Sequence, residues 1–545
     1  MAEASRILHT TLIPNFSTPT HKTPCCSPRS LSHPTTSHYY SRRATTFVRC
    51  SISTAGDAAR TAEAANSTIP WGCDVDSLEN ASALQKWLSD SGLPPQKMAI
   101  ERVEVGERGL VALKNIRKGE KLLFVPPSLF ITADSDWSCT EAGEVLKRNG
   151  VPDWPLLATY LISEASLMKS SRWSNYISAL PRQPYSLLYW TRSELDKYLE
   201  ASQIRERAIE RINNVTGTYN DLRLRIFSQY PDLFPEEVFN MEAFKWSFGI
   251  LFSRLVRLPS MDGRVALVPW ADMLNHSYHI NWLRWIHFWI MTSHQRELSL
   301  QQIGHISQVS SCCHFVIAEK DAEKEALTAV QPFSLHNAIQ VFISYGKKSN
   351  GELLLSYGFV PREGTNPRDS VQLSLLLKKS DKCYKEKFEA LRKHGLSASQ
   401  CYPVQITGWP LELMAYAYLA VSPPSMIGKF DEMAAAASNK TTSKKDIRYP
   451  EIDEQALQFI LECCESSISK YSKFIQQSGS MDLDVTSPKQ LNRKLFLKQL
   501  AVDICTSERR ILFRSQYILR RKLRDIRSGE LKALNLFDGF RKLFK

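Results

Sequence analysis

The sequence predicts an α+β protein in which small β units are interrupted and then followed by helical segments. Three observations predict this class. Short apolar runs separated by Gly turns occupy 99–126, the segment 141–257 has helical periodicity, and so does most of the chain beyond about residue 370. The chain has 545 residues, of which 43% are hydrophobic and 23% charged, and these globular proportions exclude wholesale disorder and fibrous architectures.

The first fifty residues have the composition of an organelle transit peptide. They hold one acid, Glu3, against six Lys or Arg, sixteen of them are Ser or Thr, and no secretory-type apolar run is present. The ending Val48-Arg49-Cys50-Ser51 is more typical of plastid than of mitochondrial processing sites, and a merely disordered tail is the alternative. We therefore expect a plastid transit peptide at 1–50, a linker at 51–75 and a location in the chloroplast stroma. Without residues 1–50 the net charge falls from +13 to about +8.

The first half of the remaining chain predicts a helix, a small folded-over β unit and then a long helical stretch. Gly92 and the pair Pro94-Pro95 end the first helix. Thr191 and Glu194 have the spacing of a capping box at the start of a later helix. The expected elements are a helix at 82–88, strands at 99–105, 110–113 and 122–126, a buried helix at 244–258, and strands at 265–269 and 341–345.

Helices are expected from about residue 370 to the end, at 388–394, 410–420, 454–473 and 487–527. The last of them opens with Ser487 as the N-cap and Pro488 at the first helical position. Its later part is rich in Lys and Arg around a leucine stripe, a pattern that suits nucleic acid or an acidic partner. A solvated face of a packed helix is the favoured interpretation, because aromatic residues for base stacking are sparse there.

Neither a metal site nor a membrane span is expected. The twelve cysteines include no CxxC pair, and the adjacent donors of Cys312-Cys313-His314 do not easily converge on one tetrahedral ion. Unpaired cysteines fit a reducing compartment. The most apolar run, 280–291, is too short to span a bilayer and contains Arg284.

Three local strings carry the most information about function. They are Glu107-Arg108-Gly109-Leu110-Val111-Ala112, Trp270-Ala271-Asp272-Met273-Leu274-Asn275-His276-Ser277 and Ile343-Ser344-Tyr345-Gly346. In this order, around a helical insertion, they resemble the SET-domain protein methyltransferases. The string Tyr176 to Pro181, the pair Tyr189-Trp190 and the stretch Ser349 to Val360 narrow the resemblance to the plant Rubisco large-subunit methyltransferase-like branch.

The resemblance implies a fold, a reaction and a cofactor. The implied fold is a SET domain of small folded β-sheets with a pseudoknot, split by a helical insertion and followed by an all-α Rubisco-methyltransferase-type substrate-binding domain. The corresponding ranges are 76–360 for the SET domain, 141–245 for the insertion and 370–530 for the substrate-binding domain. The implied reaction is methyl transfer from S-adenosyl-L-methionine to a protein lysine, which must be neutral to attack although its free pKa is near 10.4.

The resemblance also implies roles for individual residues. Tyr345 takes the place of the catalytic tyrosine, and Tyr357 that of a tyrosine lining the lysine pocket. Ser253 and Arg254 match a Ser-Arg pair whose arginine engages the cofactor carboxylate, a group that the Arg fork suits. The full set of expected cofactor-binding residues is Glu107, Gly109, Ser253, Arg254, Asp272, Asn275, His276 and Tyr345.

The segment 278–340 departs from this pattern. It holds three tryptophans between His279 and Met291, no acid occurs between Asp272 and Glu297, and it is longer than the family's usual connection. It resembles translated non-coding sequence, with a lineage-specific insertion as the alternative. Because this connection holds strands and lines the site in the SET fold, the departure bears on cofactor and lysine binding.

The leading hypothesis is a plastid protein-lysine N-methyltransferase, with Rubisco large subunit or aldolase as family-type substrates. A non-catalytic SET-like scaffold of the plastid nucleoid or transcription machinery is a second hypothesis, and a protein-histidine methyltransferase is a third. The expected partner is a protein with a target lysine, the expected state is a monomer, and a nucleic-acid contact is disfavoured but stays open.

Overall fold

The computed structural model describes twelve stretches of the chain: 69–73, 78–104, 107–116, 121–182, 185–258, 264–277, 315–317, 327–330, 340–361, 364–438, 447–479 and 488–528. The expected transit peptide at 1–50 and the expected N-cap Ser487 lie outside these residues.

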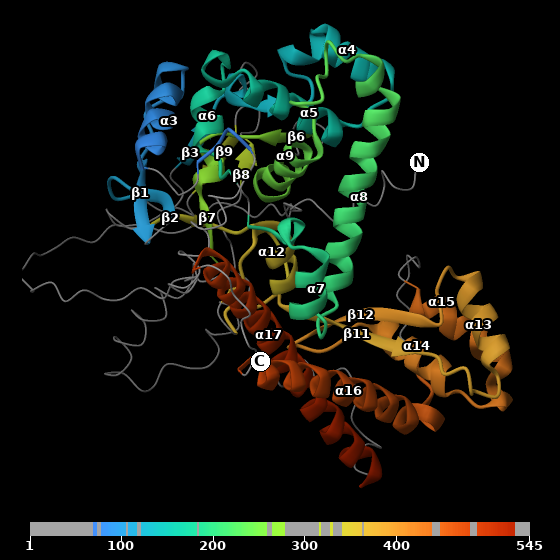
Figure 1. Ribbon diagram of the computed structural model, residues 1–545. Coiled ribbons are helices and arrows are strands. Elements are labelled where there is room, and N and C mark those ends of the chain that lie inside the picture. The colour runs from blue at the N-terminus through green and yellow to red at the C-terminus, as the bar shows by residue number, and fades with distance from the viewer. Residues whose placement is uncertain are drawn as a thin grey trace, which may run out of the picture.

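Two buried apolar clusters organise the described chain. One joins the small sheets to the helices that follow them, from Ile69 to Ile343. The other is built mainly from residues beyond Leu354 and also includes the stretch from Leu187 to Ala208. Figure 1 shows the corresponding parts as an upper body of short strands and helices and a lower, mostly helical body, with α8 (Ile204–Arg225) running from the upper part down to α7 (Arg192–Tyr198).

The upper body contains short strands in several small sheets. β1 (Met98–Glu104) and β2 (Glu107–Ala112) form an antiparallel pair with a register shift between Arg102 and Glu104. The other ladders have the orders β3-β9-β8, β4-β6-β5 and β10-β7. Their strands are β3 (Lys121–Val125), β4 (Ile131–Thr132), β5 (Val256–Leu258), β6 (Arg264–Leu267), β7 (Asn275–His276), β8 (Phe315–Ile317), β9 (Leu327–Val330) and β10 (Phe342–Ile343).

Within the segment expected to be atypical, two stretches are strands. β8 and β9 pair with each other, and β9 pairs antiparallel with β3, so that Val125 lies opposite Leu327. The connection therefore supplies strands to the upper body, as the resemblance implied. The other residues from 278 to 339, including the tryptophan-rich stretch, lie outside the described part.

Helices cover the small sheets. The expected capping box is present, because the Thr191 side chain accepts from the Glu194 N–H and the Glu194 carboxylate accepts from the Thr191 N–H. The expected helix 244–258 ends earlier, at Arg254, and its last residues form β5 instead. The other helices that precede the lower body in the sequence are α3 (Leu78–Asp90), α4 (Glu141–Arg148), α5 (Asp153–Ser166), α6 (Ser174–Ala179), α9 (Met241–Arg254) and α12 (Asn350–Tyr357).

The segment expected to be a linker is packed at its end. Trp71 is buried, and its ring meets Trp246 edge-on at 5.6 Å. Arg182 donates to the Ile69 carbonyl at 2.7 Å, and the Cys73 N–H donates to Leu180 O at 2.8 Å. The linker prediction is therefore wrong for 69–73, because the Ala, Ser and Thr around them concealed two large apolar anchors.

The lower body is helical apart from one antiparallel ladder. β11 (Ser370–Leu376) pairs with β12 (Ser399–Gln405), so the expectation of an all-helical domain missed these two strands. Buried and more exposed residues alternate along Ser370–Leu376, as in a strand with one buried face. The same alternation of apolar and polar residues in the sequence is the signal that would have identified β11. The helices are α13 (Tyr384–Lys393), α14 (Leu411–Val421), α15 (Phe430–Ala437), α16 (Asp453–Gly479) and α17 (Pro488–Arg527).

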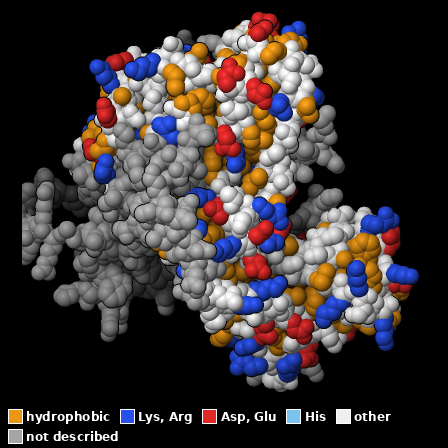
Figure 2. Space-filling model, viewed as in Figure 1, with side chains coloured by type: hydrophobic (Ala, Val, Ile, Leu, Met, Phe, Trp, Pro, Cys, Tyr) orange, Lys and Arg blue, Asp and Glu red, His pale blue; other side chains and the backbone are white. Residues whose placement is uncertain are grey.

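The basic helix α17 packs along α16, and part of its charge is paired. Arg520 lies 2.8 Å from Glu465, and Arg527 lies 2.8 Å from Glu454. Figure 2 shows Lys and Arg alternating with Asp and Glu over the lower body. This mixture is typical of a solvated face. Among the described residues, no helix is both long and apolar enough to cross a membrane.

A buried polar network joins the two bodies at the start of α12. The Asn350 N–H donates to Asp369 at 2.9 Å, and its side-chain amide donates to Ser507 of α17 at 2.9 Å. The Asn350 side-chain oxygen accepts from Asn366 at 2.8 Å. Because buried polar groups are costly unless they are satisfied together, this network fixes α12 against the lower body.

Glu508, next to this network on α17, makes the stability of the interface depend on pH. Burial raises the pKa of its carboxyl group to about 8, although the hydroxyls of Ser202 and Tyr471 oppose the shift. The stabilisation by the neutral carboxyl is thus complete below about pH 4.5 and is lost as the pH rises through about 8.

We expect Glu508→Gln to remove this loss of folding stability at high pH. The unfolding midpoint of the wild type should fall below that of the variant by roughly 5 °C at pH 9, and the two should converge near pH 5. Thermal scans from pH 5 to pH 9 measure this, with the exposed Glu200→Gln as the control. Three parallel curves would show that Glu508 does not titrate in this range.

Candidate functional site

The candidate site is organised by a parallel contact between two very short strands. Phe342 of β10 pairs with Asn275 of β7, and Ile343 pairs with His276. The Ser277 N–H extends this contact by donating to Ile343 O at 3.1 Å. On the other side, the Val341 N–H donates to Leu110 O of β2 at 2.8 Å. The three strings singled out in the sequence therefore meet at one place.

Tyr345 follows β10 directly and is held at both ends. Its backbone N–H donates to His276 Nδ1 at 3.1 Å, and its hydroxyl donates to Leu274 O at 2.9 Å. The ring stacks on His276 at a centroid distance of 5.0 Å and on Tyr357 at 4.5 Å. The half-buried phenol is thereby fixed beside the β7 backbone.

The structure places His276 inside this arrangement and buries its side chain. Burial, together with the nearby charge of Lys348, lowers the pKa of the imidazole to about 4, although the contact with the Ile343 backbone opposes the shift. The ring is therefore neutral at physiological pH, and Nδ1 accepts from the Tyr345 backbone. His276, which is expected to bind the cofactor, also holds the backbone of Tyr345.

Tyr357, at the end of α12, forms an aromatic wall with Phe359. The centroids of their rings are 6.2 Å apart, and Phe359 lies 6.1 Å from His276. Gly358 ends α12 with a φ of 77°, and a Cβ there would overlap the Tyr185 backbone. The turn therefore requires glycine, and it fixes the two rings on either side of it.

A buried arginine that the sequence analysis missed supports this wall. Arg211 of α8 donates to the Ser356 hydroxyl at 2.9 Å and lies over the Phe252 ring at 4.6 Å. Burial lowers the pKa of its guanidinium to about 9. A lone Arg within a helix that carries many charges gives no signal of burial, so only the packing of α8 on α12 identifies it.

Lys348 is a second buried cation that the sequence did not reveal. Burial lowers the pKa of its ammonium to about 8, and Glu352 opposes the shift while Arg211 and Arg207 reinforce it. Lys348 lies three residues after Tyr345 in the sequence, and its neighbour Lys347 is exposed. The aromatic wall is thus backed by a group of buried positive charges.

The polar part of the site centres on Asn275 and Gly109. The Asn275 amide donates to Arg108 O of β2 at 3.0 Å. A Cβ at Gly109 would come within 2.9 Å of Asn275 Nδ2 and 2.6 Å of Gln340 Nε2. A side chain at 109 would therefore displace the Gln340 and Asn275 amides that pack on the β2 backbone.

Arg254, at the end of α9, is oriented by Asp272. Its Nη1 donates to Asp272 O at 3.0 Å and lies 3.4 Å from the Asp272 carboxylate. The Tyr176 hydroxyl donates to the same carboxylate at 2.6 Å. Burial raises the pKa of the Asp272 carboxyl, and burial together with the nearby Asp272 charge raises that of Tyr176.

Asp272, expected to bind the cofactor, is almost fully buried and acts on the guanidinium. The link from Tyr176 through Asp272 to Arg254 fixes the position of the guanidinium, whose planar fork matches the geometry of a carboxylate. Trp270, just before this stretch, is buried with a φ of 81°, a strained conformation that the surrounding packing maintains. The residues present therefore fit a cofactor that carries a carboxylate.

Ser253 and Glu107 are the other two residues that were expected to bind the cofactor. The Ser253 hydroxyl donates to Gly249 O at 2.9 Å within its own helix, so its geometry is that of an intrahelical contact. Glu107 begins β2, but its side chain lies outside the described part. The structure brings together Gly109, Arg254, Asp272, Asn275, His276, Tyr345 and Tyr357.

Comparisons with known proteins identify a matching family model and several distant relatives. A family model described as Rubisco LSMT substrate-binding matches residues 378–512. The chain is 25% identical over 444 residues to the chloroplastic ribulose-1,5 bisphosphate carboxylase/oxygenase large subunit N-methyltransferase of Nicotiana tabacum, covering 80% of this chain and 81% of that protein. It is 25% identical over 441 residues to the chloroplastic fructose-bisphosphate aldolase-lysine N-methyltransferase of Arabidopsis thaliana, covering 80% and 82%.

Histidine-directed relatives and solved structures also match. The human actin-histidine N-methyltransferase is 25% identical over 349 residues, which cover 62% of this chain and 52% of that protein. The solved structure of Rubisco LSMT bound to AdoMet has a TM-score of 0.58 at 24% identity and covers 85% of this chain and 99% of that one. The solved SET domain of LSMT bound to lysine and AdoHcy has a TM-score of 0.59 at 23% identity, with 86% and 99% covered.

We expect Gly109→Ala to weaken S-adenosylmethionine binding about tenfold or more, because the added Cβ displaces the Asn275 amide. Calorimetric titration of the cofactor measures the affinity. Gly428→Ala is the matched control, since nothing lies within 4 Å of its Cβ. Unchanged affinity in a folded Gly109→Ala variant would mean that the placement of Asn275 does not matter for the cofactor.

Proposed function

The chain is a distant member of the Rubisco LSMT-like SET-domain family of S-adenosylmethionine-dependent protein methyltransferases, and we propose that it methylates a lysine side chain of a chloroplast protein. The observation that carries the proposal is the double fixation of Tyr345 by His276 and Leu274 against the aromatic face of Tyr357. We infer that the methylene chain of the acceptor lies along this aromatic face, beside the phenol and the Leu274 carbonyl oxygen, and we call this inferred path the channel.

The channel would orient the lysine nitrogen and exclude water. In the reaction a new N–C bond forms while the S–C bond of the methyl donor breaks, and the amine gives up a proton. The sulfonium cofactor, when bound, supplies the electrophilic methyl group. We propose that Tyr345 and the Leu274 carbonyl contact that methyl through weak C–H···O bonds, and that positioning accounts for much of the rate.

The buried charges around the channel favour the neutral amine. Lys348 and Arg211 are positive, and Lys348 already depresses the pKa of His276. The same positive charge disfavours an ammonium group placed beside Tyr345. Because His276 stays neutral at physiological pH, it adds no further charge to the channel.

The cofactor residues are proposed from the same geometry. Arg254, oriented by Asp272, would receive the cofactor carboxylate, and Asn275 with the glycine surface of β2 would hold its other end. Asp272 and His276 are assigned positioning roles. We further propose that the SET domain spans 76–360, with an insertion at 141–245, and that the substrate-binding domain spans 370–530.

Substrate and compartment rest on the relatives. Two chloroplastic N-methyltransferases, one of them named as lysine-directed, match over four fifths of this chain, which supports a plastid acceptor of the Rubisco or aldolase kind. The acid-poor, Ser- and Thr-rich residues 1–50 support the same compartment. An acceptor histidine is the second candidate, because histidine-directed relatives match at equal identity over a shorter length.

Tyr345→Phe should reduce methyl transfer at least tenfold, because the hydroxyl that bonds Leu274 is lost while the ring stacking is kept. The assay incubates the full chain with labelled S-adenosylmethionine and chloroplast stromal protein, and mass spectrometry locates the modified residue. Tyr517→Phe, an exposed tyrosine of α17, is the control. Absence of labelling by the wild type would refute the enzymatic proposal, and a methylated histidine would decide for the second candidate.

Lys348→Met should move the pH dependence of the reaction upward. Below about pH 8 the charge of Lys348 helps to deprotonate the bound acceptor amine, so the midpoint of the kcat profile, which reports groups in the enzyme–substrate complex, should rise by about 0.5 to 1 pH unit without it. Rates from pH 6 to pH 10 on the labelled acceptor measure this shift. The adjacent exposed Lys347→Met is the matched control, and equal midpoints in both variants would rule out an electrostatic role.

A further inference from the structure

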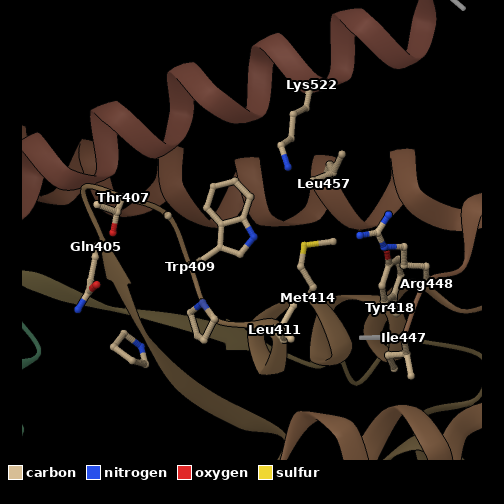
Figure 3. Close-up of a pocket in the computed structure, with 13 residues that line it drawn as sticks. Gln405, Thr407, Trp409, Leu411, Met414, Tyr418, Ile447, Arg448, Leu457 and Lys522 are labelled. Atoms are coloured by element: carbon tan, nitrogen blue, oxygen red, sulfur yellow. The ribbon is translucent and has the colours of Figure 1, made fainter. Parts of the chain in front are cut away.

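The lower body contains a cavity that is separate from the methyl-transfer site. Its volume is about 440 Å³, within the range of ligand pockets in proteins. It is enclosed by the end of β12, the start of α14, the residues before α16, and α16 and α17 themselves. Figure 3 shows Lys522 reaching from α17 toward the Trp409 ring, with Met414 and Leu411 below it. None of the site residues named above lines this cavity.

One part of the cavity is apolar and adaptable. Trp409, Leu411 and Met414 line it and are only half-buried, so they present large apolar surfaces to an incoming group. Tyr418 and Leu457 are buried behind them. A flat indole beside a flexible thioether suits an aromatic or branched aliphatic side chain.

The other part of the cavity is cationic. Lys522 and Arg448 both line it, and the lining residues include no Asp or Glu among those that the structure describes. Lys522 Nζ lies 5.6 Å from the centre of the Trp409 ring, so the apolar and cationic parts adjoin each other. Asp453 is the nearby acid; it accepts the Tyr418 hydroxyl and offsets part of the positive charge.

We propose that this cavity is a docking pocket for an acidic–apolar segment of the protein substrate, with an aromatic or leucine side chain on Trp409 and Met414 and an adjacent carboxylate on Lys522 and Arg448. Charge complementarity selects the acid, and the surrounding domain matches a model described as substrate-binding, which favours a protein segment as the occupant. The proposal rests on the proposed function. It specifies a second contact with the substrate, at a distance from the lysine that is methylated.

Peptide binding by the full chain tests the pocket without any methyl transfer. The probe is a fluorescein-labelled nonapeptide, Ser-Gly-Asp-Phe-Glu-Leu-Asp-Gly-Ser, followed by anisotropy at low salt. The comparison peptide, called the amide peptide, has Asn in place of each Asp and Gln in place of Glu. We expect the acidic peptide to bind at least tenfold more tightly than the amide peptide.

Variants locate the binding. Trp409→Ala and Lys522→Met should each weaken the acidic peptide at least fivefold, and Lys522→Met should also remove most of the preference over the amide peptide. Arg521→Met, the exposed neighbour on α17, should keep both affinities. S-adenosylmethionine titration of each variant verifies that the upper body remains folded.

Equal affinity for the two peptides, or affinities that the pocket variants do not change, would overturn the proposal. Indole-3-acetate provides a second arm: if this small acid binds in a Lys522-dependent way and the peptide does not, the occupant is a free organic acid and the proposal is wrong. Because no methyl transfer is measured, the pocket can fail while the proposed enzymatic activity stands, and the reverse also holds.

Discussion

The parallel pairing of β7 with β10 is the contact on which the rest of the site depends. It brings His276 next to Ile343 and Tyr345, although 67 residues of chain separate His276 from Ile343. Two-residue strands supply little backbone energy of their own, so the pairing is maintained by what surrounds it. Two hydrogen bonds flank the pairing of β7 with β10. One joins Val341 to β2, and the other joins the Tyr345 hydroxyl to the Leu274 carbonyl.

The aromatic wall of Tyr357 and Phe359 depends on this pairing and also on how α12 is held in place. Tyr357 reaches Tyr345 only because α12 is fixed at both of its ends. At the first end Asn350 is tied to Asp369 and Ser507, and at the last end Gly358 turns tightly against Tyr185. The lower body therefore contributes to the geometry of the site.

Burial shifts the pKa values of several ionisable side chains near the site. The pKa of His276 is low, so the imidazole is a neutral acceptor, and the pKa values of Lys348 and Arg211 are lowered beside the channel. Each shift is caused first by the loss of hydration, and neighbouring charges modify it. A methyl acceptor that must lose its proton is well served by such surroundings, whereas the solvated arginines of α17 pair with the carboxylates of α16.

The sequence by itself determined the fold class, most helices and the three strings that form the site, because helical periodicity, Gly turns and capping signals are local. It also determined that Gly109, Asn275, His276, Tyr345 and Tyr357 belong together, through their resemblance to a family.

The contacts of these residues come from the tertiary structure. Asp272 lies against the Arg254 guanidinium, His276 accepts from the Tyr345 backbone, and the Ser253 hydroxyl bonds its own helix. The burial of Lys348 and Arg211, the anchoring of Trp71 and the pocket around Trp409 and Lys522 were equally invisible in the sequence. Burial and hydrogen-bond partners are set by residues far apart in the chain, and no local pattern of side chains specifies them.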